Sequence, residues 1–203
     1  MKRLLALFVL VVASAAARAE APVILVFGDS ISAGYGLPLE QGWVELLRTR
    51  LKTQGYGYQV VNASVSGETT AGGLARLPRA LELHHPNIVI VELGGNDGLR
   101  GLPIAQMRAN LTQMVNLSVA AGAKVLLLGM RMPPNYGPQY TEQFAMVFSE
   151  LAAEKKIPLV PFLLTDIALS PALLQSDDIH PNVLGQPILL DNVWPTLKPL
   201  LHK

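Results

Sequence analysis

The chain has 203 residues, 50% of them hydrophobic, and its 16 Lys and Arg nearly balance its 15 Asp and Glu. This balance argues against nucleic acid as a partner, because nucleic-acid-binding domains carry a basic excess. With no cysteine and only four His, the chain forms no disulfide, and its composition argues against a structural zinc site or another bound metal. The length fits one domain with a sizeable hydrophobic core.

The first residues have the pattern of a secretory signal peptide. Basic residues at positions 2 and 3 precede the apolar run Leu4–Ala13, and the small-residue site Ala17–Ala19 follows. We expect a signal peptide at residues 1–19 and a single domain at residues 20–203, in the periplasm or outside the cell. A membrane anchor is the alternative. The uncharged run is shorter than the roughly 20 residues that span a bilayer, so we expect no transmembrane segment in the mature chain.

Short apolar runs alternate with helical patterns along the rest of the chain. The first run ends in Gly28-Asp29-Ser30 and has the composition of a strand buried on both faces of a parallel sheet. In chain order, the patterns predict strands and helices at Val23–Phe27 (strand), Gln41–Leu51 (helix), Tyr58–Val61 (strand), Ile88–Leu93 (strand), Ile104–Val119 (helix), Lys124–Gly129 (strand), Gln139–Lys155 (helix), Leu159–Phe162 (strand) and 183–201 (a helix interrupted by prolines). Alternating strands and helices indicate an α/β fold, with a parallel sheet covered by helices on both faces.

Three loops leave the carboxyl ends of the first three predicted strands, and they carry Ser30, Gly67 and Asn96. Ligands of open parallel sheets bind at this edge, so the hydroxyl of Ser30 is placed for chemistry. On this stretch alone an alternative has equal weight. Asp29 and Ser30 can simply turn the chain and cap a helix, since both residue types favour such positions.

The histidines divide into a candidate for catalysis and three others. His84 and His85 precede the third predicted strand, at the opposite edge of the sheet, and we interpret them as surface residues rather than as a metal pair. His180 instead follows two acidic residues. A serine nucleophile needs a neutral imidazole to take its proton, and the imidazole needs a carboxylate to fix its tautomer. One of the two acidic residues can alternatively cap the last helix.

Ordered blocks along the chain match the pattern of a known family. The blocks are Gly28–Ser32, Val61–Ser64, Gly67, Gly73–Pro78, Val91–Gly101, Pro134–Gly137 and Asp177–His180. Together they resemble the SGNH, or GDSL, hydrolase family over the whole mature chain, and within it the exported bacterial thioesterases, lysophospholipases and arylesterases. The resemblance implies a three-layer α/β/α sandwich of flavodoxin-like type, with a five-stranded parallel sheet, and an esterase without a cofactor.

The resemblance also implies roles for individual residues. Ser30 becomes the nucleophile, His180 the general base and later the general acid, and Asp177 the carboxylate that orients the imidazole. The oxyanion hole maps to the backbone N–H groups of Ser30 and Gly67 and to the side-chain amide of Asn96. Such fixed donors suit ester hydrolysis, because the carbonyl oxygen gains charge when it is attacked.

One position departs from the family pattern. Asp178 stands where close relatives often have glycine, so two carboxylates compete for His180. Asp177 is three residues ahead and reaches the imidazole within one turn, whereas a locally extended chain would present Asp178 instead. We favour Asp177 on the family's spacing.

The loops at the site edge carry an apolar set suited to an acyl chain, although such residues also form satellite cores under long loops. The resemblance favours esters and thioesters of acyl chains, lysophospholipids included, as small-molecule substrates. We expect the protein to be a monomer. Two alternatives remain open: a carbohydrate acetylesterase of the same fold, and a non-catalytic periplasmic lipid-binding protein. The candidate substrate-binding residues are Leu99, Leu102, Met132, Pro133 and Tyr136.

Overall fold

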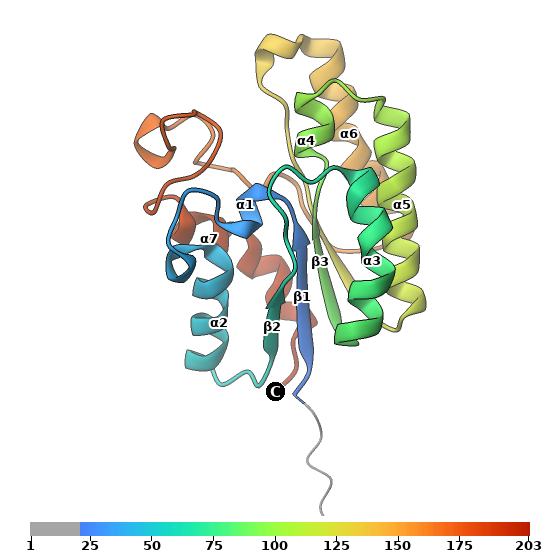
Figure 1. Ribbon diagram of the computed structural model, residues 1–203, viewed down its shortest axis with the longest axis vertical. Coiled ribbons are helices and arrows are strands. Elements are labelled where there is room, and N and C mark those ends of the chain that lie inside the picture. The colour runs from blue at the N-terminus through green and yellow to red at the C-terminus, as the bar shows by residue number, and fades with distance from the viewer. Residues whose placement is uncertain (1–20) are drawn as a thin grey trace, which may run out of the picture.

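Five parallel strands form one sheet in the middle of the molecule (Figure 1). The structure is a computed structural model that describes residues 21–203, so the predicted signal peptide lies outside the described residues. The sheet has the spatial order β2-β1-β3-β4-β5. Its strands are β1 (Val23–Gly28), β2 (Gln59–Asn62), β3 (Ile88–Glu92), β4 (Lys124–Leu128) and β5 (Leu159–Val160).

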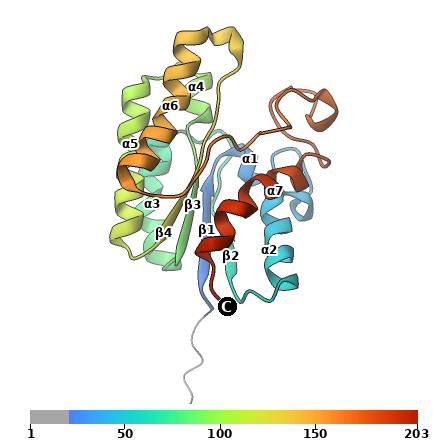
Figure 2. The ribbon, with the colours of Figure 1, turned by 180° about the vertical axis from the view of Figure 1, so that it is seen from behind.

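Helices cover both faces of the sheet. They are α1 (Ser30–Ala33), α2 (Trp43–Thr53), α3 (Thr70–His84), α4 (Gly95–Leu99), α5 (Ile104–Ala120), α6 (Pro138–Lys155) and α7 (Gln186–Leu197), with short 3₁₀ helices at Leu39–Gln41, Pro134–Tyr136, Pro171–Leu173 and Lys198–Leu200. On one face α5 packs between α3 and α6, and on the other α2 packs against α7 (Figure 1, Figure 2). The predicted three-layer α/β/α sandwich is therefore confirmed. No helix within residues 21–203 is long and apolar enough to cross a membrane.

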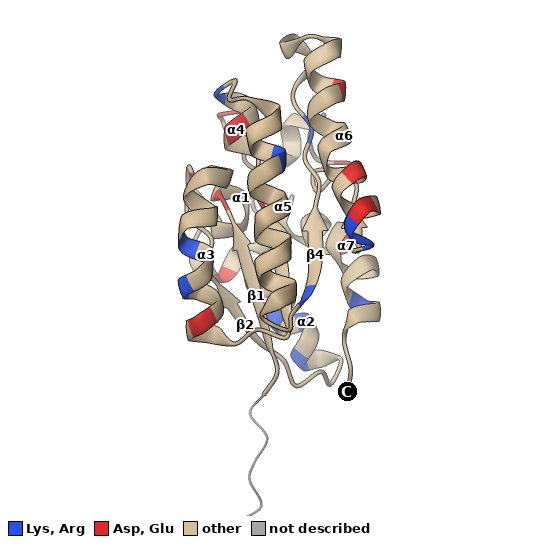
Figure 3. Cartoon of the chain, turned by 90° about the vertical axis from the view of Figure 1, so that its right-hand side faces the viewer, with Lys and Arg blue, Asp and Glu red and all other residues tan. Residues whose placement is uncertain are grey.

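The apolar runs of the sequence become strands because both of their faces are covered. Nearly every residue of β1, β3 and β4 is buried, as central parallel strands require. The helices bury one face each, and acidic and basic residues are interspersed along the outer helices (Figure 3). Core formation thus follows the hydrophobic pattern of the sequence.

The winding of the chain creates a ligand-binding edge. The chain leaves β1 through α2 to reach β2, and then crosses through α3 to β3 on the other side of β1. The carboxyl ends of β1 and β3 therefore border the point at which the winding direction switches, where open α/β sheets bind ligands. Ser30 is the second residue after β1, and Asn96 lies in α4 shortly after β3, so both flank this point.

Three helices, α1, α3 and α4, were not predicted. In α3 the weak helix formers Gly72, Gly73 and Pro78 interrupt the sequence pattern that would predict a helix. The structure explains Gly73, because a Cβ there would lie only 2.5 Å from Cδ1 of Leu93 in the sheet layer. The side chain of Thr69 begins the helix by accepting a hydrogen bond from the N–H of Gly72. Close packing and a capping residue therefore outweigh the low intrinsic propensity.

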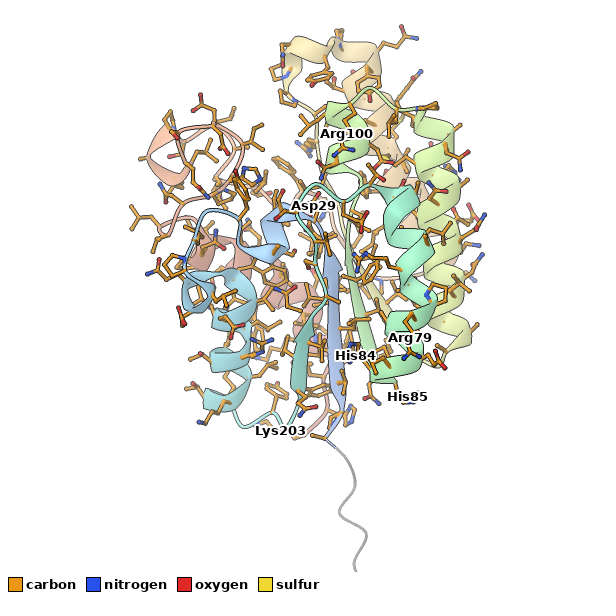
Figure 4. All side chains as sticks on the ribbon, in the orientation of Figure 1. Asp29, Arg79, His84, His85, Arg100 and Lys203 are labelled. Atoms are coloured by element: carbon orange, nitrogen blue, oxygen red, sulfur yellow. The ribbon has the colours of Figure 1, made fainter. Side chains whose placement is uncertain are left out.

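His84 and His85 precede β3 as predicted, whereas the last strand is shorter than predicted. His84 ends α3 and His85 follows it in a left-handed conformation with φ of 41°, so neither lies on a strand. Both still lie at the edge of the sheet opposite Asp29 (Figure 4). β5 ends at Val160 rather than at the predicted Phe162, because the chain there turns into a long loop.

Candidate active site

Ser30 begins a single helical turn at the carboxyl end of β1. The side chain of Asp29 caps this turn by accepting a hydrogen bond of 3.0 Å from the N–H of Ile31. Gly34 ends the turn with φ of 73°, a conformation that favours glycine. The sequence Gly-Asp-Ser therefore does turn and cap the chain, and in doing so it presents Ser30 at the edge of the sheet.

His180 comes from the long loop between β5 and α7. Its carbonyl accepts a 2.7 Å hydrogen bond from the N–H of Gln175, and the side chain of Gln175 donates to the carbonyl of Tyr35 at 2.8 Å. The ring of Tyr35 also packs on the imidazole, with 4.7 Å between ring centroids. These contacts fasten the loop of His180 to the segment that follows Ser30.

A chain of short contacts links the three side chains. Nε2 of His180 lies 2.8 Å from Oγ of Ser30, and Nδ1 lies 2.6 Å from Oδ2 of Asp177. Oδ1 of Asp177 accepts hydrogen bonds of 3.0 Å from the N–H groups of Ile179 and His180. Slight burial opposes ionisation of Asp177, but the hydrogen bonds from His180 and Ile179 prevail and lower its pKa to about 2. Asp177 is thus a fixed anion beside the imidazole.

Asp178 has a different environment from its neighbour. Its φ is 56°, in the left-handed region, and its N–H donates to the carbonyl of Gln175 at 3.1 Å. Within residues 21–203 its carboxylate makes no hydrogen bond to His180, whose Nδ1 faces Asp177. The left-handed backbone explains why glycine suits this position.

The three predicted oxyanion-hole donors follow the carboxyl ends of β1, β2 and β3. The N–H groups of Ser30 and Gly67 donate to no other group in the described part of the chain. Gly67 has φ of 77°, a conformation that favours glycine, and Nη2 of Arg100 donates a 2.8 Å hydrogen bond to its carbonyl oxygen. The amide of Asn96 donates one hydrogen bond to Oδ2 of Asp29 at 3.1 Å, and its second N–H has no acceptor among residues 21–203. Asp29 and Arg100 mark this edge in Figure 4.

A cavity of about 550 Å³ opens beside Ser30 and His180. Its walls come from α4, from the segment after β4 and from the loop after β5, and most of its lining is apolar. Of the predicted substrate-binding residues, Leu99, Met132 and Pro133 line it. Leu102 and Tyr136 are not among its lining residues. The hydroxyl of Tyr136 instead donates a hydrogen bond of 3.0 Å to the carbonyl of Leu99.

Much of the cavity wall was missed from the sequence. The additional lining residues belong mainly to the loop after β5, where no periodic pattern indicates which side chains point inward. They include Met130, Arg131, Phe162, Leu164, Ala168, Leu169, Leu174 and Ile179. Among residues 21–203, no cluster of three or more His, Cys, Asp or Glu side chains has the arrangement of a metal site.

The chain matches the GDSL-like Lipase/Acylhydrolase family over residues 26–188. The chain belongs to this family. The predicted family and enzyme class, a hydrolase of ester bonds, are thereby confirmed.

Relatives within the family are similar over almost their full length. The chain is 56% identical to the Esterase TesA of Pseudomonas aeruginosa, over 91% of this chain and 92% of the relative. It is 43% identical to the Thioesterase 1/protease 1/lysophospholipase L1 of Escherichia coli, over 91% of this chain and 87% of the relative. The crystal structure of TesA matches with a TM-score of 0.87 at 56% identity, covering 88% of this chain and 99% of that one. The psychrotrophic esterase EstA from Pseudoalteromonas sp., in a structure inhibited by monoethylphosphonate, matches with a TM-score of 0.84 at 42% identity. The match covers 87% of this chain and 97% of the EstA chain.

Proposed function

We propose that this protein hydrolyses carboxylic esters and thioesters of acyl chains through an acyl-enzyme on Ser30. The observation that carries the proposal is the line of contacts from Ser30 through His180 to Asp177, at 2.8 and 2.6 Å, at one end of an apolar cavity. The relatives named as esterase and as thioesterase and lysophospholipase support this substrate class.

The first half-reaction forms the acyl-enzyme. Nε2 of His180 takes the proton of Ser30 as Oγ attacks the carbonyl carbon of the substrate, and Asp177 keeps Nδ1 protonated and stabilises the imidazolium. The carbonyl oxygen becomes an oxyanion, which the N–H groups of Ser30 and Gly67 and the amide of Asn96 stabilise. His180 then gives its proton to the departing alcohol or thiol, and the bond to the leaving group breaks.

The second half-reaction releases the acid. Water enters beside His180, which takes one proton from it, and the resulting hydroxide attacks the acyl carbonyl. The same three donors stabilise the second oxyanion, and His180 returns the proton to Oγ of Ser30 as the ester bond breaks. The enzyme is regenerated without a cofactor in either half-reaction.

The cavity supports an acyl chain rather than a sugar as the bound group. Its wall is formed largely by Leu, Met, Pro and Phe side chains, which remove apolar surface of a ligand from water. A carbohydrate acetylesterase would need polar groups that recognise sugar hydroxyls, and the wall offers few. A lipid-binding protein without activity would have no need of the contacts between Ser30, His180 and Asp177.

A series of nitrophenyl esters from acetate to palmitate, with matched thioesters, tests this function. We expect turnover on both series, with kcat/KM rising beyond the acetyl ester. Binding without turnover would indicate a lipid-binding protein, and activity confined to acetyl groups would indicate an acetylesterase. Ala168 lines the cavity, so Ala168→Phe should fill part of its volume. We expect this variant to have a lower kcat/KM for long-chain esters and an unchanged kcat/KM for the acetyl ester.

We also propose that the protein acts after export, with cleavage following Ala19. The basic, apolar and small-residue segments of residues 1–19 support this. N-terminal sequencing of the protein from a periplasmic fraction should begin at Glu20. An uncleaved N-terminus in the cytoplasmic fraction would contradict the proposal.

A further inference from the structure

The buried carboxyl group of Glu92 contacts Asp29 and Ser32, on either side of Ser30, and the mechanism above does not use it. Glu92 ends β3, is fully buried and pairs in register with Gly28 of β1. A Cβ at position 28 would lie 2.5 Å from Oε2 of Glu92. The glycine before Asp29 and Ser30 therefore leaves room for this carboxyl group.

The contacts of Glu92 hold both sides of the helical turn that begins with Ser30. Oε2 accepts hydrogen bonds from the N–H of Asp29 at 3.2 Å and from Oγ of Ser32 at 2.7 Å. Oε1 has no hydrogen-bond partner in the described part of the chain. This asymmetry fits a neutral carboxylic acid, in which Oε2 is the carbonyl oxygen and Oε1 carries the proton. An ionised group would leave a charged oxygen buried without a partner, which is far more costly.

The charged surroundings of Glu92 also favour its neutral form. Within residues 21–203 no Lys, Arg or His forms an ion pair with Glu92 or with Asp29, and Asp29 is the titratable group that faces Glu92. Burial, and then the charge of Asp29, raise the pKa of Glu92 well above its usual value. Burial raises the pKa of Asp29 to about 6, against hydrogen bonds from the N–H of Ile31 and the amide of Asn96 and the charge of nearby His180. Two adjacent buried carboxyl groups do not both ionise readily, so at neutral pH the pair keeps one proton.

The charge of the pair then belongs to Asp29, which has a direct task. Its Oδ2 accepts from the amide of Asn96 at 3.1 Å (Asp29 is labelled in Figure 4). An anion at this place binds one N–H of that amide and excludes the flipped orientation, in which the amide oxygen would face Asp29. The second N–H is thereby directed to the oxyanion.

We propose that Glu92 is a positioning residue that remains a neutral carboxylic acid, so that Asp29 carries the single charge of the pair and orients Asn96 for the oxyanion. The proposal rests on the proposed function, because it assigns Asn96 to the oxyanion hole. It has one consequence that does not involve activity: Glu92 holds its proton in the folded protein.

Two substitutions of Glu92 separate its shape from its charge. Glu92→Gln keeps an acceptor at the position of Oε2 and never ionises, so we expect it to retain at least about a third of the wild-type kcat. Glu92→Met has a similar length but no acceptor for Asp29 and Ser32, and it should lower kcat by about 10-fold to about 100-fold with KM within about 2-fold. Asp97→Asn is the matched control. Asp97 is also a buried carboxyl residue, but it binds Thr70, and its variant should lower stability without this split between kcat and KM.

The protonation state is measured through stability. Because the pKa of Glu92 is raised in the folded state, wild-type stability decreases as the pH rises above the unfolded value of 4.5, and Glu92→Gln lacks this decrease. The urea midpoint of the variant should therefore rise relative to wild type between about pH 5 and about pH 8. The infrared spectrum of the wild type should also contain a protonated carboxyl band that the variant lacks.

The results distinguish the proposal from the proposed function. Equal losses of kcat in the Gln and Met variants would show that a charged Glu92 is required, and would overturn the proposal. Unchanged kcat in both variants would remove Glu92 from the positioning of Asn96. If the wild type hydrolysed no ester, the proposed function would fail, whereas the pH dependence of stability would still report the proton on Glu92.

Discussion

Asp177→Asn replaces a carboxylate oxygen with an amide nitrogen, and the structure indicates which way the new amide must point. Oδ1 accepts two backbone hydrogen bonds, from the N–H groups of Ile179 and His180, and only an oxygen can do so. The NH₂ group must therefore occupy the place of Oδ2 and face Nδ1 of His180. Nδ1 then becomes an acceptor, the proton moves to Nε2, and the imidazole can no longer take the proton of Ser30.

The size of the effect follows from these hydrogen bonds. Flipping the amide to restore the correct tautomer would break two hydrogen bonds worth about 1 kcal/mol each, so the wrong tautomer prevails by about 30-fold. The variant also loses the charged hydrogen bond to the imidazolium, which is worth about 1.5 kcal/mol after allowance for a side chain that is 36% exposed, or about 10-fold. Together we expect kcat to fall by about 300-fold.

The assay is kcat on a short-chain nitrophenyl ester, with Asp178→Asn as the matched control. Asn accepts the left-handed backbone of position 178, and within residues 21–203 the carboxylate there makes no hydrogen bond to His180, so kcat of the control should stay within about 2-fold of wild type. A loss of less than about 10-fold in Asp177→Asn, or a larger loss in Asp178→Asn, would refute the reasoning.

Two further substitutions test other parts of the site. Asn96→Ala removes one oxyanion donor and should lower kcat by about 10²-fold or more with little change in KM, whereas near wild-type kcat on an ester whose chemical step limits the rate would exclude this role. Asp178→Gly relieves the left-handed conformation at φ of 56° and should raise the free energy of unfolding by about 0.5 kcal/mol, seen as a rise in Tm of about 1–2 °C. A fall in Tm would show instead that the Asp178 side chain stabilises the loop.

The strands could be predicted from the sequence because each is a short apolar run between turn residues. α3 could not, because its glycines are explained only by the sheet that they approach, as the contact of Gly73 with Leu93 shows. The same limit applies to the cavity. The loop after β5 is held by non-periodic contacts, such as those of the Asn192 amide with the carbonyls of Leu163 and Thr165, so its inward-facing residues have no sequence pattern.

The active site contains residues that could be predicted from the sequence and one, Glu92, that was not. Ser30, Asn96 and His180 could be placed together because parallel strands share one carboxyl edge and because the family pattern supplied their spacing. Glu92 was not singled out, although an acidic residue at the end of the apolar run of β3 is a usable signal. Its meaning depends on the neighbouring Gly28 and Asp29, which only the register of β1 and β3 reveals.

The central claim is that Ser30 carries the acyl group, and covalent labelling tests it most directly. A serine-directed phosphonate, followed by mass spectrometry of the digested protein, should place one label on Ser30 and abolish ester hydrolysis. Ser30→Ala should bind no label and lose activity while its thermal unfolding remains close to that of wild type, because Ser30 is a turn residue outside the hydrophobic core. A label on Ser64 or Ser66, or hydrolysis by Ser30→Ala at the wild-type rate, would contradict the account.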